Sequence, residues 1–268
     1  MTISDFKVMA EKEGITLTDK QLNQFQKYYE LLVEWNSFMN LTAITDFDEV
    51  IVKHFLDSIL LVKASQTDII KKAVNGEGVT LVDVGTGAGF PAVPIKIAFP
   101  GIKVTLIDSL NKRIKFLNEV ISSLELKDIE AIHSRAEEGA TGKYREKFDI
   151  AVSRAVANLS TLSEYCLPYV KTGGVFVAYK SEELLNPRKV SDDELAELDR
   201  NSIKYLLTQK SEKEVSSKAI NILGGSIENI YEYSLIDNYR CLCVIRKEKV
   251  TPKKYPRKAG LPSKEPIV

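Results

Sequence analysis

Residues 81–91 read Leu81-Val82-Asp83-Val84-Gly85-Thr86-Gly87-Ala88-Gly89-Phe90-Pro91. The apolar run that ends at Val84 predicts a buried parallel strand, and the apolar residues 92–99 predict a helix. Between them, three alternating glycines predict a tight turn. A strand, a glycine loop and a helix in this order form the first unit of a doubly wound α/β sheet.

A second predicted strand, residues 104–107, ends in Asp108. This acid follows the glycines by about 20 residues, which is the spacing at which a carboxylate binds the hydroxyls of a ribose. Gly85 and Gly87 have no Cβ, so the backbone can turn sharply and approach a ligand closely. Together these residues predict a nucleoside site at the carboxyl edge of the sheet.

The glycine spacing indicates which nucleoside is bound. Gly-x-Gly-x-Gly is one residue tighter than the dinucleotide fingerprint Gly-x-Gly-x-x-Gly, and Asp83 stands two positions before the first glycine. This variant resembles the S-adenosylmethionine loop of class I methyltransferases. The alternatives are an ordinary strand-to-helix turn and a nicotinamide-dependent oxidoreductase, which the spacing disfavours.

Composition limits the class of protein. The 268 residues are 44% hydrophobic, and 37 basic residues balance 37 acidic ones, so any nucleic-acid contact must be a local patch. Three cysteines in apolar contexts indicate buried thiols in a reducing compartment, and two histidines make a metal site improbable. The first residues lack a signal pattern, and no apolar run is long enough for a bilayer. We therefore expect a cytoplasmic monomer that binds neither membrane nor metal.

The first 74 residues predict a helical extension. Thr18 and Gln21 form a capping box, and a helical stripe of apolar residues follows to Met39. The next predicted helix starts at residues 46–49 and carries His54 and Asp57, which are neighbours at a spacing of three. We interpret His54 as a hydrogen-bonded histidine in a helix interface, and the alternative is a polar lip over the nucleoside site.

The remaining strands predict the rest of the sheet. Apolar runs at 129–133, 148–152 and 175–179 are three further strands, and two longer runs around Asp237-Asn238 predict a hairpin. The fold class is therefore α/β: a class I methyltransferase domain, Rossmann-like, with a mostly parallel sheet and a C-terminal antiparallel hairpin. We predict a helical extension over 1–74, a methyltransferase domain over 75–248 with a partly helical excursion at 181–217, and a basic, proline-containing tail over 249–268.

Several cations are candidates for binding RNA. Lys112 and Arg113 lie where a helix should begin, although the helix dipole disfavours cations there, so either they serve an anionic partner or they form a solvated face. Prolines and cations make the tail extended, and it is either a disordered end or a nucleic-acid contact. The candidates are Lys112, Arg113, Lys180, Lys253, Lys254, Arg257 and Lys258.

The fourth strand indicates the kind of methyl acceptor. It ends in Ser153-Arg154, without the Asn-Pro-Pro-Tyr clamp for an amine or the Pro-Cys pair for a pyrimidine carbon. Such a site favours an acceptor that needs positioning more than acid–base help, such as guanine N7. Arg154 is the candidate positioning residue in catalysis.

These motifs resemble those of the RsmG (GidB) family, bacterial methyltransferases of guanine N7 in small-subunit ribosomal RNA. The matching stretches are 35–36, 39–42, 54–58, 83–91, 108–113, 135–137, 153–157, 167–168 and 251–258. Two departures are Ala92, where the family often has glycine, and the long segment 181–217.

The resemblance implies that S-adenosylmethionine is contacted by Gly85, Phe90, Ala136, Glu137 and Arg154. Gly87 and Asp108 are further candidates for binding it, from the glycine loop and the acid at the strand end. The resemblance also implies methylation of the guanine at position 527 of 16S ribosomal RNA. The substrate is either the naked RNA or the small ribosomal subunit. The alternatives are a methyltransferase of another RNA and a non-catalytic RNA-binding protein with this fold.

Overall fold

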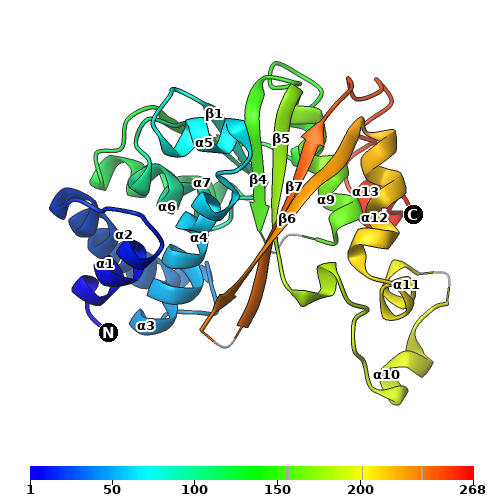
Figure 1. The fold of residues 1–268 in the computed structure, drawn as a ribbon, viewed down its shortest axis with the longest axis horizontal. Coiled ribbons are helices and arrows are strands. Elements are labelled where there is room, and N and C mark those ends of the chain that lie inside the picture. The colour runs from blue at the N-terminus through cyan, green and yellow to red at the C-terminus, as the bar shows by residue number, and fades with distance from the viewer. Residues whose placement is uncertain (155–156, 201, 237) are drawn as a thin grey trace. The chain divides into compact units, whose positions relative to one another are not determined.

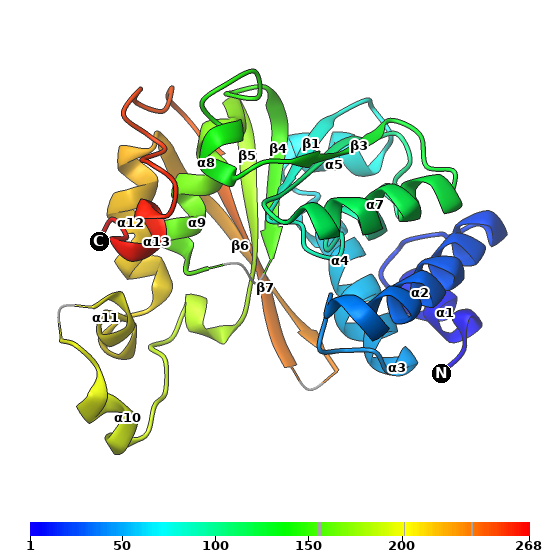
Figure 2. The same cartoon turned by 180° about the vertical axis from the view of Figure 1, so that it is seen from behind.

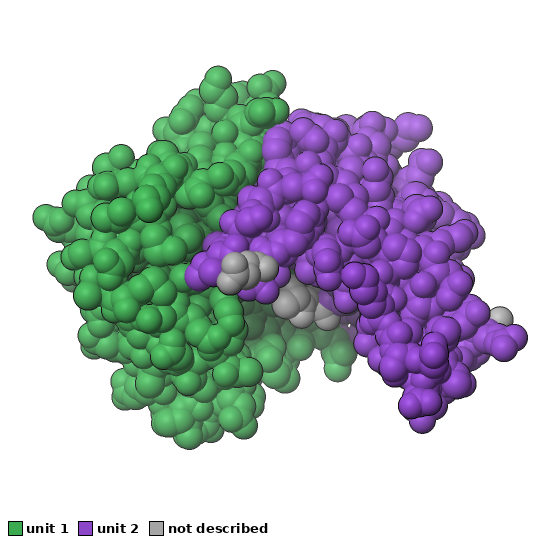
Figure 3. Space-filling view, turned by 60° about the horizontal axis from the view of Figure 1, so that its bottom comes forward, with its two compact units in different colours: residues 1–136, 148–154 green, residues 137–147, 155–268 purple. Residues whose placement is uncertain are grey.

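The structure, a computed structural model, describes residues 1–154, 157–200, 202–236 and 238–268. The chain forms two compact units, which Figure 3 distinguishes by colour. Unit 1 contains residues 1–136 and 148–154, and unit 2 contains residues 137–147 and 155–268. The glycine loop, Asp108 and Arg154 belong to unit 1, whereas Glu137 and the tail belong to unit 2. Two residues of the matching stretch 153–157, Ala155 and Val156, lie outside the described part, as does Asp237 of the hairpin turn.

Helices form the first part of unit 1. The helix α1 (Ile3–Lys12) is followed by α2 (Asp19–Met39), and the predicted capping box of Thr18 and Gln21 is confirmed. The next predicted helix is divided into α3 (Phe47–Val50), the π-helical turn η1 (Ile51–Leu56), α4 (Asp57–Ile59) and the 3-10 helix η2 (Leu60–Ala64), before α5 (Asp68–Val74). No proline or glycine marks these divisions, so the sequence carries no local signal for the π turn.

Four parallel strands form the sheet of unit 1. They are β1 (Thr80–Val84), β2 (Lys103–Asp108), β3 (Ile129–His133) and β4 (Phe148–Arg154), in the order β3-β2-β1-β4. Val84 is in register with Ile107, and Asp108 with His133, so the carboxyl ends of the strands lie at one edge. This edge is where an open α/β sheet binds its ligand. Each predicted strand of this unit is confirmed to within two residues at either end.

Two crossover helices bury one face of this sheet. The helices α6 (Ala92–Ala98) and α7 (Asn111–Ser123) follow β1 and β2, and both pack against α2. Figure 2 shows α7 beside α2. Every residue of α6 is buried, which explains its largely apolar sequence. Its one charged residue, Lys96, donates hydrogen bonds to the carbonyl oxygens of Pro100 and Ile102, both at 2.7 Å. The helical extension is therefore part of the core that supports the glycine loop.

Three antiparallel strands form the sheet of unit 2. The strand β5 (Val170–Lys180) pairs with β7 (Asn238–Lys247), which pairs with β6 (Gly225–Leu235), and β6 and β7 form a long hairpin (Figure 1). The predicted antiparallel hairpin is confirmed. The strand β5 follows the short helix α8 (Ala136–Gly139), the helix α9 (Leu159–Cys166) and the 3-10 turn η3 (Leu167–Tyr169).

The segment after β5 contains short helices, as predicted for 181–217. These are η4 (Glu182–Leu184), α10 (Asp192–Glu197), α11 (Ile203–Gln209) and α12 (Glu212–Ile222). The expected end of this excursion at residue 217 and a following helix from Lys218 were wrong, because Ser211 and Glu214 form a capping box that starts α12 at Glu212. The helix α12 packs against α9 and β6.

The C-terminal tail is ordered and packs within unit 2. Arg145 donates hydrogen bonds to the carbonyl oxygens of Tyr255 and Thr251, at 2.8 and 2.7 Å. The Thr251 side chain is completely buried, and the tail ends in the short helix α13 (Leu261–Lys264). Of the two alternatives that the sequence left open, a disordered end is therefore wrong. The expectation of an extended tail is also wrong, because turns and α13 interrupt it.

Candidate active site

The glycine loop lies directly after β1. Its backbone is held by the N–H groups of Gly85 and Thr86, which donate to the carbonyl oxygen of Ile107 at 2.9 and 3.1 Å. Gly85, Gly87 and Gly89 have φ angles of +74°, +60° and +98°. These angles lie in the region that glycine adopts without steric cost, so the tight spacing in the sequence reflects a real backbone requirement.

The second and third glycines have different roles. A Cβ at Gly89 would lie 2.6 Å from the Tyr28 hydroxyl and 2.7 Å from a methyl group of Val93, so this glycine is needed for packing inside unit 1. A Cβ at Gly87 would meet no atom within 4 Å. The open side of Gly87 is therefore free for a ligand.

Asp108 lies at the end of β2 and touches the loop. Its Oδ2 accepts hydrogen bonds from the Gly87 N–H at 3.0 Å and from Arg113 at 3.2 Å, while Oδ1 accepts from the Leu110 N–H at 2.9 Å. A carboxylate offers about four acceptor positions, so this one still has capacity for a ribose hydroxyl. The structure thus places the predicted ribose acid beside the predicted glycine floor.

Asp83, which the sequence places two residues before the loop, is completely buried. Its Oδ2 accepts from the Thr86 hydroxyl at 2.8 Å and from the Ala92 N–H at 3.2 Å, while Oδ1 has no partner among the described residues. Burial raises the pKa of this carboxyl to about 7. A buried acceptor without a partner is costly unless a ligand supplies a donor, and an ammonium group is suited to it.

Arg154 ends β4 and is held by the helical extension. Its Nη1 donates to Asp57 Oδ2 at 2.8 Å and to the Lys53 carbonyl oxygen at 3.0 Å, and its Nη2 lies 3.2 Å from His54 Nδ1. The guanidinium also lies over the ring of Phe90, 5.2 Å from its centroid. His54 is thus hydrogen-bonded as interpreted, but its contact with a residue at a strand end of the sheet was not foreseen.

Glu137 lies in unit 2 and is buried. Its Oε1 accepts a hydrogen bond from the Gly260 N–H at 2.7 Å, so the tail fixes a residue that the family resemblance places at the cofactor. Its neighbour Ala136 begins α8 and belongs to unit 1. No sequence pattern predicts the contact with Gly260, because it joins residues far apart in the chain.

The candidate RNA-binding cations fall into two groups. Three are paired with buried carboxylates: Arg113 with Asp108 at 3.2 Å, Lys180 with Glu212 at 2.6 Å and Arg257 with Glu164 at 2.6 Å. The other four are exposed, and they are Lys112, Lys253, Lys254 and Lys258. The Lys112 ammonium donates to the Met39 carbonyl oxygen at 3.2 Å but stays at the surface.

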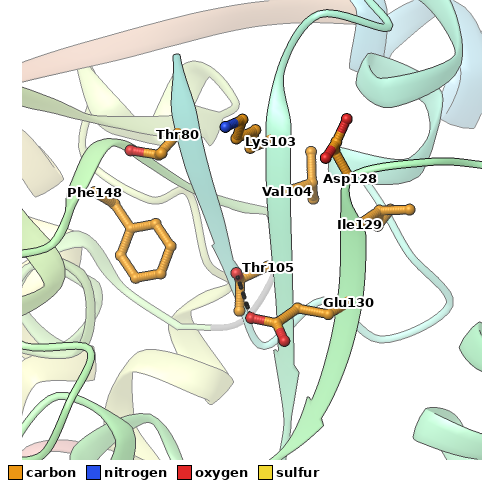
Figure 4. Close-up of a pocket in the computed structure, with 8 residues that line it drawn as sticks. All are labelled: Thr80, Lys103, Val104, Thr105, Asp128, Ile129, Glu130 and Phe148. Atoms are coloured by element: carbon orange, nitrogen blue, oxygen red, sulfur yellow. Dashed lines mark hydrogen bonds between the residues drawn. The ribbon is translucent and has the colours of Figure 1, made fainter. Parts of the chain in front are cut away.

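A hollow of about 340 Å³ lies elsewhere in unit 1 (Figure 4). Its lining includes Thr80, Lys103 and Phe148, the first residues of β1, β2 and β4. It is therefore at the amino ends of the strands, and it is separate from the glycine loop, Asp108 and Arg154, which lie at the carboxyl ends.

Within the described ranges, no group of three metal-ligating side chains is found, and no helix there is long and apolar enough to cross a membrane.

Comparison with known proteins identifies the family. A family model for rRNA small subunit methyltransferase G, GidB, matches residues 21–221. The chain belongs to this family. A protein of that name from Lachnoclostridium phytofermentans is 51% identical over 258 residues, which cover 95% of this chain and 93% of the relative. Another protein of that name, from Ligilactobacillus salivarius, is 45% identical, and the alignment covers both chains over their full length.

Solved structures agree on the fold. A protein of Corynebacterium glutamicum has a TM-score of 0.51 at 14% identity, covering 88% of this chain and 94% of that one. A candidate O-methyltransferase of Klebsiella pneumoniae also has a TM-score of 0.51, at 8% identity, covering 83% and 90%. At these identities the likeness concerns the fold alone. The predicted fold class is confirmed, and as a GidB-family methyltransferase this enzyme uses S-adenosylmethionine as its methyl donor.

Proposed function

We propose that this protein transfers a methyl group from S-adenosylmethionine to N7 of the guanine at position 527 of 16S ribosomal RNA. The observation that carries the proposal is the family match over residues 21–221. The alternative is that another RNA is the substrate, which would require the same chemistry at the site. The labelling experiment below distinguishes this RNA from 16S ribosomal RNA. Ribosomal RNA methylation also accounts for the expected location in the cytoplasm.

The site residues of unit 1 fit the methyl donor. The open side of Gly87 accommodates a ligand against the backbone, Asp108 offers acceptors for a ribose, and the Asp83 oxygen without a partner suits an amino group. When bound, S-adenosylmethionine would supply the methyl group of its sulfonium: an acceptor lone pair would attack the methyl carbon in line, and the sulfur would leave as a neutral thioether. Phe90, Arg154 and Ala136 complete the set in this unit.

The groups around Arg154 support an acceptor that carries no proton. The Asp57 carboxylate is ion-paired with Arg154 and nearly buried, and His54 accepts a hydrogen bond from the same guanidinium. Both groups are engaged, so neither is available as a general base. Guanine N7 has a lone pair and no proton, and it therefore needs only to be held in place.

RNA contact on a chain of net charge zero must be local. The exposed lysines of the tail, Lys253, Lys254 and Lys258, form the densest group of exposed candidates. Replacing all three by glutamine should weaken RNA binding for any sequence. It should also flatten the log–log salt dependence by roughly 0.7 to 0.9 for each phosphate that is no longer neutralised. Titrations of labelled 16S RNA at several salt concentrations measure both quantities.

A matched control removes the same charge elsewhere. Lys12, Lys71 and Lys72 are also exposed, and their triple glutamine variant should keep the wild-type salt slope. Arg257 is left intact in both proteins because its pair with Glu164 is structural. An equal reduction of slope in the two triple variants would show that the tail has no specific part in RNA binding.

The proposed reaction is tested with methyl-labelled S-adenosylmethionine and 16S RNA, given as naked RNA and as small subunits. The RNA is digested and its nucleosides are separated. We expect the label in 7-methylguanosine. Label in a different nucleoside would contradict the N7 assignment, label only in another RNA would support the alternative substrate, and no label in any RNA would support non-catalytic binding.

A further inference from the structure

His54 and Asp57, both from the helical extension, surround the end of β4. Arg154 donates to the Asp57 carboxylate at 2.8 Å and to the Lys53 carbonyl oxygen at 3.0 Å, and its Nη2 lies 3.2 Å from His54 Nδ1. The Arg154 side chain is 13% exposed and that of Asp57 is 3% exposed. A pair this deeply buried is held rigidly, because either partner alone would be left as an uncompensated charge.

Two groups lie at the same distance from His54 Nδ1. Arg154 Nη2, at 3.2 Å, can only donate, and the Lys53 carbonyl oxygen, also at 3.2 Å, can only accept. In the neutral ring with its proton on Nε2, Nδ1 accepts from Arg154. Nε2 lies 3.1 Å from the Thr42 hydroxyl, which can accept that proton. Burial and the nearby Arg154 charge lower the pKa of His54 to about 4, which keeps the ring neutral near pH 7.

The support extends outward from His54. Asn36 Oδ1 accepts from the backbone N–H groups of Leu41 and Thr42, at 2.6 and 2.9 Å, and so holds the loop that carries the Thr42 hydroxyl. His54 itself lies in the π-helical turn η1, a geometry that is frequent at functional sites. Its ring stacks on Phe90 of the glycine loop, with centroids 4.4 Å apart. Arg154 and the loop are thus held by the same side chain.

Three of the five N–H groups of Arg154 are used by these contacts. The other two, on Nε and Nη2, have no acceptor among the described residues, and a rigid guanidinium presents such donors in a fixed geometry. We infer that His54 and Asp57 are positioning residues for methyl transfer, which fix the Arg154 guanidinium so that its two remaining donors bind the methyl donor or the acceptor. This inference rests on the proposed function, in which Arg154 belongs to the site.

A double-mutant cycle separates positioning from simple stabilisation. Asp57→Asn should lower kcat about 100-fold, since a misplacement of about 1 Å can have an effect of this size. In an Arg154→Ala background the same change should lower kcat less than about twofold, because its target is already gone. The affinity for S-adenosylmethionine, measured by calorimetry without RNA, should show the same lack of additivity.

Two substitutions at His54 test the role of Nδ1. The amide oxygen of His54→Asn lies near the Nδ1 position and can still accept from Arg154, so we expect kcat within about fivefold of wild type. His54→Leu has no acceptor, and its kcat should fall about as far as that of Asp57→Asn. Glu49→Gln is the matched control, because Glu49 is an exposed partner of Lys53 outside this cluster and its change should leave kcat unaltered.

The outcomes are distinct. Equal decreases of kcat from Asp57→Asn in the two backgrounds, or equal kcat for His54→Asn and His54→Leu, would overturn the positioning role. Melting temperatures of all variants show whether a decrease follows stability instead. If the wild-type protein methylates no RNA, the proposed function fails, but the calorimetric cycle with S-adenosylmethionine alone still decides whether Asp57 acts through Arg154.

Discussion

Gly87→Ala is expected to lower the affinity for S-adenosylmethionine at least 100-fold while the protein stays folded. The new Cβ meets no protein atom within 4 Å, so it projects into the space that we assign to the ligand. The φ angle of +60° makes alanine strained, at roughly 1–2 kcal/mol. For a chain of this size, the strain should lower the melting temperature by only about 2–8 °C. Calorimetric titration and a thermal melt measure the two effects.

Gly14→Ala is the control for this strain. Gly14 has a φ of +76° and an equally open Cβ position, but it follows α1 and is remote in sequence from the loop. It should show the same decrease of melting temperature with unchanged affinity. Wild-type affinity in Gly87→Ala would mean that the ligand does not approach this glycine. Gly85→Val would be a poorer test, because the φ of +74° strains a branched residue severely.

Removal of the tail after Lys249 is expected to abolish the cooperative unfolding transition. The cut would leave the buried Lys247 without Thr251 and the buried Glu164 without Arg257. It would also leave Arg145 without its three carbonyl acceptors in the tail. Breaking the buried pair of Glu164 by removing its partner costs about 3–5 kcal/mol, and each hydrogen bond lost by a charged group costs about 1.5–3 kcal/mol. Together these losses are comparable with the whole stability of a domain, about 5–15 kcal/mol. Binding of S-adenosylmethionine and of RNA should disappear together.

A shorter deletion is the control for the tail. Removing Val268 alone keeps α13, Arg257 and the contact of Gly260 with Glu137. It also keeps the hydrogen bond from the buried Ser160 to the Ile267 carbonyl oxygen, so its melting temperature should stay close to that of the full chain. Circular dichroism of both proteins during heating makes the comparison. If the protein cut after Lys249 melts normally and loses only RNA affinity, the tail is a nucleic-acid arm and not a structural element.

The glycine loop and Asp108 could be predicted because their signals are local. Glycine spacing, an apolar run on each side and an acid at a strand end are all visible within a short window, and the structure brings Asp108 into contact with Gly87. The strands were predictable for the same reason, since buried runs are bounded by polar residues and glycines. The start of α12 was missed although its capping box at Ser211 was visible, because the charged residues around it favour a surface loop.

The contacts that hold the site could not be predicted, because they join distant parts of the chain. Arg154 and Asp57 are 97 residues apart, and Gly260 and Glu137 are 123 apart. Charge presents the same difficulty. The sequence shows that Arg257 is a cation in a basic tail, but only the packing of the tail on α9 shows that Glu164 neutralises it. A count of basic residues therefore overestimates the charge that RNA can meet.

We propose that this enzyme places a methyl group on N7 of the guanine at position 527. The most direct measurement maps 7-methylguanosine by reduction and strand cleavage in 16S RNA from cells that have or lack the protein. We predict cleavage at this guanine in cells with the protein, none in cells without it, and recovery with the wild-type gene but not with Arg154→Ala. Cleavage at this guanine in both kinds of cell, or at a different base that depends on the protein, would show that this enzyme does not methylate N7 at position 527.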